Sequence, residues 1–180
     1  MTLLILGILL WYIPHSAKTL APGLHAAMGG KSKMIVALST LASIVLMVIG
    51  YRAAPVIDVW SPPAFFTHIN NLLMVVAVAI FSMTSATGKL RVAMRHPMLI
   101  GVKTWAIAHL LVNGDLASIL LFGSILAWAV IMVIRTNKAS EWVKPEITQT
   151  GMDVKYIAVT VVTFAVIAGV HMWVGPWPFG

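Results

Sequence analysis

Residues 95–115 have the sequence RHPMLIGVKTWAIAHLLVNGD, and residues 116–134 follow with LASILLFGSILAWAVIMVI. Each stretch contains an apolar run that approaches the ~20 residues an α-helix needs to cross a bilayer. Asn113, Gly114 and Asp115 separate the two runs. Glycine can end a helix in the left-handed conformation, and aspartate can cap the first turn of the next helix. The sequence here therefore predicts two membrane helices joined as a tight antiparallel hairpin.

The whole chain has the composition of a membrane protein. Of its 180 residues, 60% are hydrophobic and 9% are charged, and the mean hydropathy is +0.96. Soluble domains average about 45–50% apolar and about 25% charged residues. We expect an all-α integral membrane bundle of about six transmembrane helices that forms one domain over residues 1–180, with the third helix starting at the proline pair 62–63. The expected spans are residues 2–19, 34–51, 63–83, 97–113, 116–134 and 154–174.

The basic residues alternate between the connections of these helices. Ten of the twelve lysines and arginines lie in the first, third and fifth connections, whereas the second connection has only Arg52. Because loops rich in lysine and arginine stay in the cytoplasm, both termini are expected to face outward, to the periplasm in a Gram-negative cell. The net charge of +7 thus reflects topology and does not indicate nucleic-acid binding. The chain has no cysteine, and therefore no disulfide or thiolate ligand.

Six histidines and one intramembrane lysine, Lys103, are unusual in so apolar a chain. Ionisable groups inside membrane segments are functional hypotheses by default, and neutral imidazole is a common ligand of metal ions and haem iron. With a rise of ~1.5 Å per residue, His109 is expected roughly 6 Å below the outer end of its helix and His68 roughly 8 Å below the same surface. His171 is also expected near the outer surface, whereas His15 is expected roughly 20 Å inward.

Neighbouring side chains extend the candidate site around His109. Asn113 shares a helix face with His109, and its amide either fixes the tautomer of the imidazole or joins two helices by a hydrogen bond. Trp105 lies four residues before His109 and either forms the floor of a site for a flat cofactor or packs in the bundle. At the opposite membrane boundary, His96 is explained either by a helix cap or lipid-phosphate contact or by a functional role in the cofactor site, and Arg95 is a candidate for contact with a lipid phosphate.

These residues closely resemble the signature of the NnrU family. The resemblance lies in residues 95–115, in the His15-Ser16 pair at the end of an apolar run, and in residues 116–123, LASILLFG. It covers nearly the whole chain. The resemblance implies a bacterial inner-membrane protein associated with denitrification and nitric oxide metabolism. Its expected partners are membrane lipid and either nitric oxide or a lipophilic small molecule.

The plant zeta-carotene isomerase belongs to the same superfamily and uses haem b to isomerise a cis double bond of a carotenoid precursor. Its haem-ligating histidines match His15, in a His-Ser context, and His109, in a Trp-x-x-Ala-His context. The resemblance therefore implies haem b as cofactor, His109 and His15 as iron ligands, and lipid-phase isomerisation or redox sensing as the chemistry. Arg95 and Lys103 are candidates for pairing with the haem propionates. Ala106 occupies the position of a cysteine that takes part in ligand switching in the isomerase, so a thiolate-based switch is not expected here.

The depth count favours a different second ligand. His15 is expected several ångströms away from the level of His109 unless the first helix tilts or starts deep in the membrane, and His68 is otherwise the better partner. The resemblance ranks His15 first and leaves His68 as its rival.

Two other functions stay open. One is a non-catalytic assembly or transport partner of a nitric oxide reductase. The other is a membrane methyltransferase that uses S-adenosylmethionine, because Arg95-His96-Pro97 resembles the Arg-His-Pro motif of isoprenylcysteine and phospholipid methyltransferases. Leu99 replaces the tyrosine of that motif, and the downstream glutamate-and-tyrosine segment is not recognisable.

Overall fold

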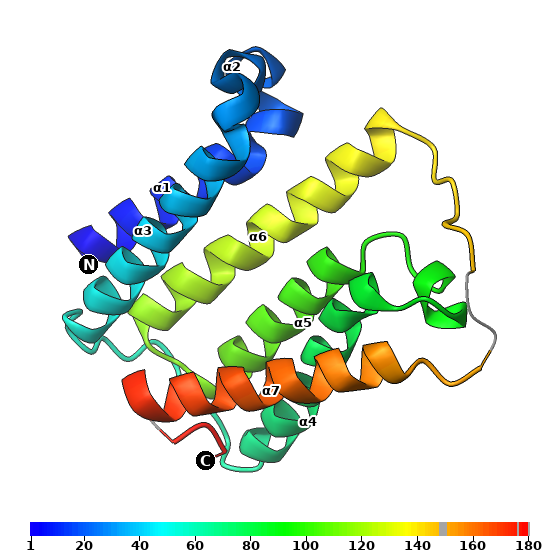
Figure 1. Cartoon of the computed structure of the whole chain (residues 1–180). Coiled ribbons are helices and arrows are strands. Elements are labelled where there is room, and N and C mark those ends of the chain that lie inside the picture. Colours follow the sequence, from blue (N-terminus) through cyan, green and yellow to red (C-terminus); the bar gives the residue numbers. More distant parts are fainter. Residues whose placement is uncertain (148–150, 176, 180) are drawn as a thin grey trace.

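The computed structural model describes residues 1–147, 151–175 and 177–179, and its regular elements within these ranges are all helical (Figure 1). Six helices coincide with the six apolar runs, which confirms the all-α fold. The elements are α1 (Thr2–Leu20), α2 (Pro22–Met28), η1 (Gly29–Lys31), α3 (Ser32–Arg52), α4 (Phe66–Ser82), η2 (Met83–Ser85), η3 (Lys89–Val92), α5 (Pro97–Val112), α6 (Leu116–Ala139) and α7 (Val154–Val174).

Four helical segments are long and apolar enough to cross a membrane, which makes the chain compatible with a multi-pass membrane protein. They are Gly29–Arg52, Phe66–Ser85, Leu116–Ala139 and Val154–Val174. The two remaining apolar helices, Thr2–Ala17 and Pro97–Val112, are shorter. The count of six spans therefore stays a prediction.

The long helices pack side by side in the order α3, α1, α6, α5, α4 and α7 (Figure 1). Helix α6 contacts both α1 and α5, and within the described residues α1 and α5 do not contact one another. Helix α7 packs on α4 and the η2 turn. Side chains from both helices nevertheless meet on α6, because Tyr12 of α1 and Leu99 and Val102 of α5 pack against the same α6 cluster of Trp128, Ala129 and Met132.

Glycines allow two of these helix pairs to approach closely. A Cβ atom on Gly50 of α3 would lie 2.2 Å from the backbone nitrogen of Leu4 in α1. A Cβ atom on Gly101 of α5 would lie 2.9 Å from the carbonyl oxygen of Ala77 and 2.9 Å from Cβ of Phe81, both in α4. Small residues are typical of membrane helix interfaces, where association depends on close packing rather than on a hydrophobic driving force.

The connection between α5 and α6 is short, as predicted, but its glycine has a different role. Gly114 does not have a positive φ, so the expected left-handed helix stop is wrong. Its carbonyl oxygen instead accepts hydrogen bonds from the backbone N–H groups of Val59 and Trp60, at 2.9 and 3.1 Å. Asp115 is the predicted N-cap of α6 and accepts from the backbone N–H of Ser118 at 3.0 Å. The turn is therefore a docking point for the connection between α3 and α4.

The predicted start of the third long helix is displaced by three residues. Helix α4 begins at Phe66, and the backbone N–H of Phe66 bonds to the carbonyl oxygen of Pro63 in a turn that precedes the helix. The prolines at 62 and 63 thus lie in the approach to α4 rather than in its first turn.

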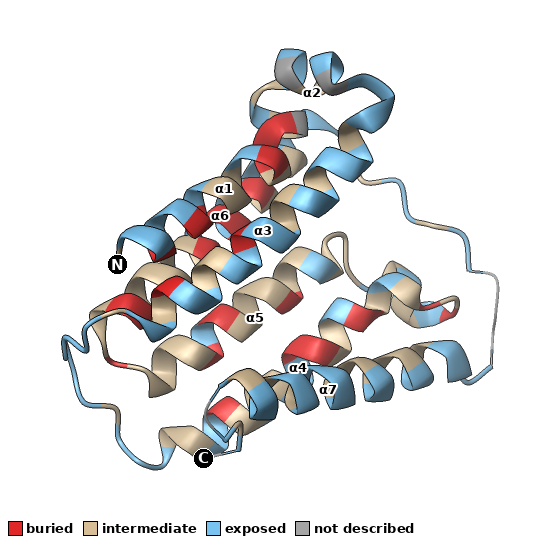
Figure 2. Ribbon diagram, turned by 60° about the vertical axis from the view of Figure 1, so that its left-hand side comes forward, coloured by how far each residue is buried: buried red, intermediate tan, exposed pale blue. Residues whose placement is uncertain are grey.

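The outer surface of the bundle is apolar, as a membrane protein requires. Helix α7 has no buried residue, and its side chains are largely apolar and exposed, including Val161, Val166 and Trp173 (Figure 2). A helix that is hydrophobic all round is typical of a membrane span. Lipid is the medium in which such a surface is stable.

Both ends of the chain lie at the same end of the bundle. Met1 packs with Ala54 around the buried Leu4, next to the connection between α3 and α4. The carbonyl oxygen of Phe179 accepts a hydrogen bond from Asn71 near the start of α4, at 2.9 Å. This end also holds the α5–α6 turn, while the connections rich in lysine and arginine lie at the opposite end.

Candidate functional site

His109 lies among aromatic side chains near the C-terminal end of α5. Its ring is nearly parallel to that of Phe122 in α6, with 4.3 Å between the ring centroids and 7° between the planes. The indole of Trp105, one turn earlier on α5, meets both rings edge-on at 5.2 and 5.1 Å. Trp105 therefore packs against the predicted ligand and helps to fix the orientation of its imidazole.

A second imidazole lies beside His109. The ring of His171, in the last turn of α7, has its centroid 6.4 Å from that of His109, and the two planes are inclined by 17°. His171 was expected at the same outer depth but not as part of the site. The similar expected depth of His109 and His171 could have indicated that they lie together. The sequence did not show that α7 lies beside α5 at this level.

Asn113 has a different role from the one expected. Its side-chain N–H donates to the backbone carbonyl oxygen of His109 at 2.8 Å and so caps the end of α5. The amide holds the helix end in place and does not orient the imidazole.

His15 lies in a separate aromatic cluster between α1, α3 and α6. Its ring is 3.9 Å from that of Trp11, with 14° between the planes, and 5.9 Å from that of Trp128, which meets it edge-on. Its Nδ1 lies 2.8 Å from the carbonyl oxygen of Trp11 and must be the donor, because a carbonyl only accepts. In the neutral ring, Nε2 is then an acceptor. It lies 3.3 Å from the hydroxyl of Thr40, which is closer to the carbonyl oxygen of Val36, at 2.7 Å.

The next residue, Ser16, ties the same cluster to α6. Its hydroxyl accepts a hydrogen bond from the indole N–H of Trp128 at 3.1 Å, and both side chains are buried. The His-Ser pair thus lies at the contact between α1 and α6.

The structure does not bring His15 and His109 together. His15 meets α6 at Trp128 and His109 meets it at Phe122, six residues earlier. Six residues correspond to ~9 Å along the helix axis and to different sides of the helix. The sequence-based depths agree with this separation, since Trp128 lies about twice as far into α6 as Phe122.

The other predicted residues of α4 and α5 lie apart from His109 as well. The side chain of His68 is exposed on α4. Lys103 is partly exposed on α5, six residues before His109 and so ~9 Å lower along the axis. Neither the described ring contacts nor the described hydrogen bonds join these two side chains to His109.

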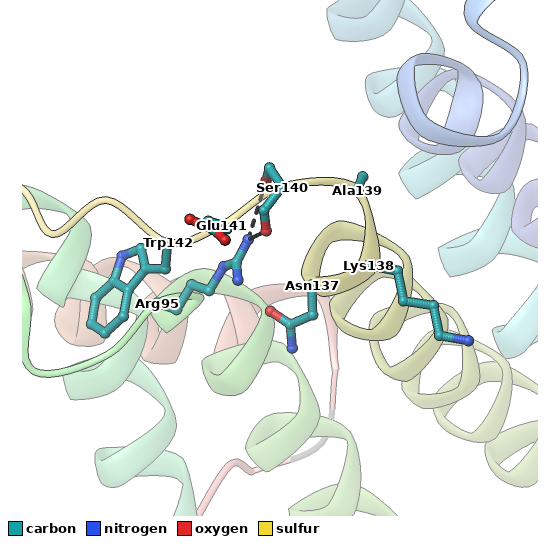
Figure 3. Close-up of a pocket in the computed structure, with 7 residues that line it drawn as sticks. All are labelled: Arg95, Asn137, Lys138, Ala139, Ser140, Glu141 and Trp142. Atoms are coloured by element: carbon teal, nitrogen blue, oxygen red, sulfur yellow. Dashed lines mark hydrogen bonds between the residues drawn. The ribbon is translucent and has the colours of Figure 1, made fainter.

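The side chain of Arg95 lies at the C-terminal end of α6 (Figure 3), and that of His96 bonds there as well. Nη2 of Arg95 donates to the carbonyl oxygens of Thr136 and Ser140, at 3.2 and 2.5 Å. Nε2 of His96 lies 2.9 Å from Oδ1 of Asn137. A cation at this position satisfies carbonyl groups that have no partner within the helix and complements the helix dipole.

The hydrogen bonds of Arg95 and His96 to the end of α6 lie beside a polar cavity of ≈ 600 Å³. The cavity is lined by Arg95, Asn137, Lys138, Ala139, Ser140, Glu141 and Trp142. Arg95 lies fourteen residues before His109, ~20 Å along α5, which is farther than a propionate reaches from the iron of one haem. This distance does not favour pairing of Arg95 with a propionate, and its side chain instead caps the end of α6, a role not predicted for it.

Asp153 joins the start of α7 to the connection between η2 and η3. Its carboxylate accepts from the backbone N–H groups of Gly88, Tyr156 and Thr87, at 2.9, 3.0 and 2.5 Å. These bonds, led by that from Gly88, lower the pKa of Asp153 because they stabilise the charged form. The carboxylate thus fixes the end of α7 that is distant from His171.

Comparison with known proteins gives one match. The family described as NnrU protein matches residues 3–178. No curated protein and no solved structure matches the chain. Because the matched region is nearly the whole chain and includes both histidine clusters, the chain belongs to the NnrU family.

Proposed function

We propose that this protein is a haem-b-binding protein of the bacterial inner membrane that acts in nitric oxide metabolism, and that His109 holds the haem iron. The observation that carries the proposal is the setting of His109: an imidazole on an apolar helix, surrounded by Phe122 and Trp105, with a second imidazole beside it. Imidazole is a common axial ligand of haem iron, and an apolar site suits a porphyrin.

The residues around His109 fit this cofactor. Phe122 covers one face of the ring and Trp105 meets its edge, so the imidazole has little freedom to rotate. Asn113 fixes the end of the helix that carries it. When bound, haem would supply an iron centre that coordinates nitric oxide or polarises a lipophilic substrate once its second, exchangeable ligand is released. The protein supplies the ligand, its orientation and the exclusion of water.

The position of the site suits small apolar ligands. His109 and His171 lie at the end of the bundle that holds both termini, and α7 presents apolar side chains along its exposed length. Nitric oxide and lipophilic molecules enter such a site from the bilayer without crossing a polar barrier. We place this end outward, with six spans and both termini in the periplasm, because the basic connections lie at the other end.

Titration of haem b into the purified, detergent-solubilised protein tests the function. We expect a stoichiometric Soret band that is lost or grossly shifted in His109→Ala and unchanged in His25→Ala, a control on α2. A wild-type protein without a Soret band would refute haem binding and would favour the non-catalytic partner of a nitric oxide reductase.

The orientation has its own test. Alkaline phosphatase fused after Gly180 is expected to be active, because it folds only outside the cytoplasm. Activity of a cytoplasmic reporter at that position, with an inactive phosphatase, would overturn the outward placement.

A further inference from the structure

The imidazoles of His109 and His171 lie close enough together for both to reach one metal ion. Their ring centroids are 6.4 Å apart and their planes are inclined by 17°. A metal ion binds at ~2 Å from an imidazole nitrogen, so two rings with one ion between them have centroids roughly 5–6.5 Å apart, the larger value when the rings lie on opposite sides of the ion. The separation of the pair therefore suits one ion bound by both His109 and His171.

We propose that His171 is the second imidazole ligand of the metal held by His109. This inference rests on the proposed function in so far as the metal is haem iron, and it assigns to α7 the role of closing the site. The ligands come from the last turns of α5 and α7, two helices that touch at this point through side chains rather than through close backbone packing.

A buried amide at the same level supports a ligand site there. In the antiparallel pair of α4 and α5, Gly101 lies opposite Ala77 and Phe81. His109 lies eight residues after Gly101 on α5. Because the two helices run in opposite directions, the same level on α4 is reached eight residues before Ala77 and Phe81, at residues 69–73. This range includes Asn70. The side chain of Asn70 is only 8% exposed, and its Oδ1 has no hydrogen-bond partner in the described part of the chain.

An unpaired buried acceptor costs ~1–3 kcal/mol and calls for an explanation. Histidines that bind metals regularly donate their second ring N–H to a carbonyl or carboxylate oxygen. Oδ1 of Asn70 is an acceptor of this kind at the level of His109. The amide is therefore expected to act as a positioning residue for a metal-bound imidazole.

The two histidines favoured by the sequence are placed less well for this role. His15 meets α6 ~9 Å from the level of His109. His68 is exposed on α4. Recruiting either one requires packed helices to slide or rotate by a turn, whereas His171 already faces His109 across a few ångströms.

Spectroscopy of the haem-loaded protein tests the assignment. We expect wild-type protein and the His15→Ala and His68→Ala variants to give the six-coordinate low-spin spectrum of iron with two imidazoles. His171→Ala should give a five-coordinate high-spin spectrum, and added free imidazole should restore the low-spin form, which a misfolded variant cannot do. A low-spin spectrum that survives in His171→Ala, or is lost in His15→Ala, would overturn the proposal.

Binding of Cu²⁺ alone separates this proposal from the haem hypothesis. Loss of a group that hydrogen-bonds to a metal ligand weakens metal binding about 10–100-fold, so loss of a direct ligand should weaken it at least about tenfold. We expect that loss in His109→Ala and in His171→Ala, and no change in His15→Ala. If the wild-type protein takes up no haem but shows this pattern with Cu²⁺, the proposed function fails and the histidine pair stands. Equal Cu²⁺ affinity of wild type and His171→Ala would refute the pair itself.

Discussion

Replacement of Gly114 by alanine should disrupt the end of the bundle at which both ends of the chain lie. An added Cβ atom would lie 1.8 Å from the carbonyl oxygen of Trp60, so the backbone of one segment has to move. Overpacking of this kind costs typically ~1–3 kcal/mol. The movement also weakens the two hydrogen bonds from Val59 and Trp60 to the carbonyl oxygen of Gly114, at ~0.5–1.5 kcal/mol each. We therefore expect a loss of about 2–6 kcal/mol in the free energy of unfolding.

Thermal unfolding of the detergent-solubilised protein, followed by circular dichroism, measures this loss. For a chain of this size 1 kcal/mol corresponds to ~2–4 °C, so the Tm of Gly114→Ala should fall by at least about 4 °C. Gly123→Ala in α6 is the matched control, because its Cβ would meet no atom within 4 Å. Alanine in a helix interior stabilises by ~0.5–1 kcal/mol, so the control should keep or raise the Tm. An unchanged Tm in Gly114→Ala, or an equal fall in the control, would refute the close-contact argument.

Two further predictions concern the opposite end of the bundle. Backbone hydrogen bonds, led by that from Gly88, lower the pKa of Asp153 in the folded protein. The ionised carboxylate therefore stabilises the fold fully above the ordinary pKa of about 4. This stabilisation is lost as the pH falls through the lowered pKa of the folded state. Asp153→Asn should therefore flatten the acid side of a Tm-against-pH profile, and an unchanged profile would contradict this. Arg95→Ala removes the hydrogen bonds to the carbonyl oxygens at the end of α6 and should destabilise the protein by about 1–2 kcal/mol, while Arg91→Ala on the exposed η3 turn should have little effect. Equal Tm values for these two variants would show that the hydrogen bonds of Arg95 to the end of α6 contribute no stability.

Much of the fold followed from local properties of the sequence. The runs that became α1, α5, α6 and α7 were predicted to within a few residues at most, because hydropathy and helix caps act over short distances along the chain. Asp115 capped α6 for the same reason. The starting residue of α4 was missed by three, because a proline pair is compatible both with a first turn and with the approach to one.

The site was predictable only in part. The depth of each histidine follows from its distance along a helix, and the separation of His15 from His109 at α6 agrees with the depths counted from the sequence. The roles of Asn113 and Arg95 could not be predicted in this way. Both side chains donate to backbone carbonyl oxygens at helix ends. Which acceptor each of them binds depends on the groups that the tertiary structure places within hydrogen-bond distance.

The sequence by itself determined that this chain is an apolar helical bundle, where most of its long helices begin, and how far each histidine lies along its helix. Only the tertiary structure decided which histidines meet: α6 separates His15 from His109, and α7 brings His171 to 6.4 Å from it. The physical reason is that depth depends on the number of residues along one helix. Lateral order depends on the shapes of whole helix surfaces, such as the close contacts at Gly50 and Gly101, and hydropathy does not encode these shapes.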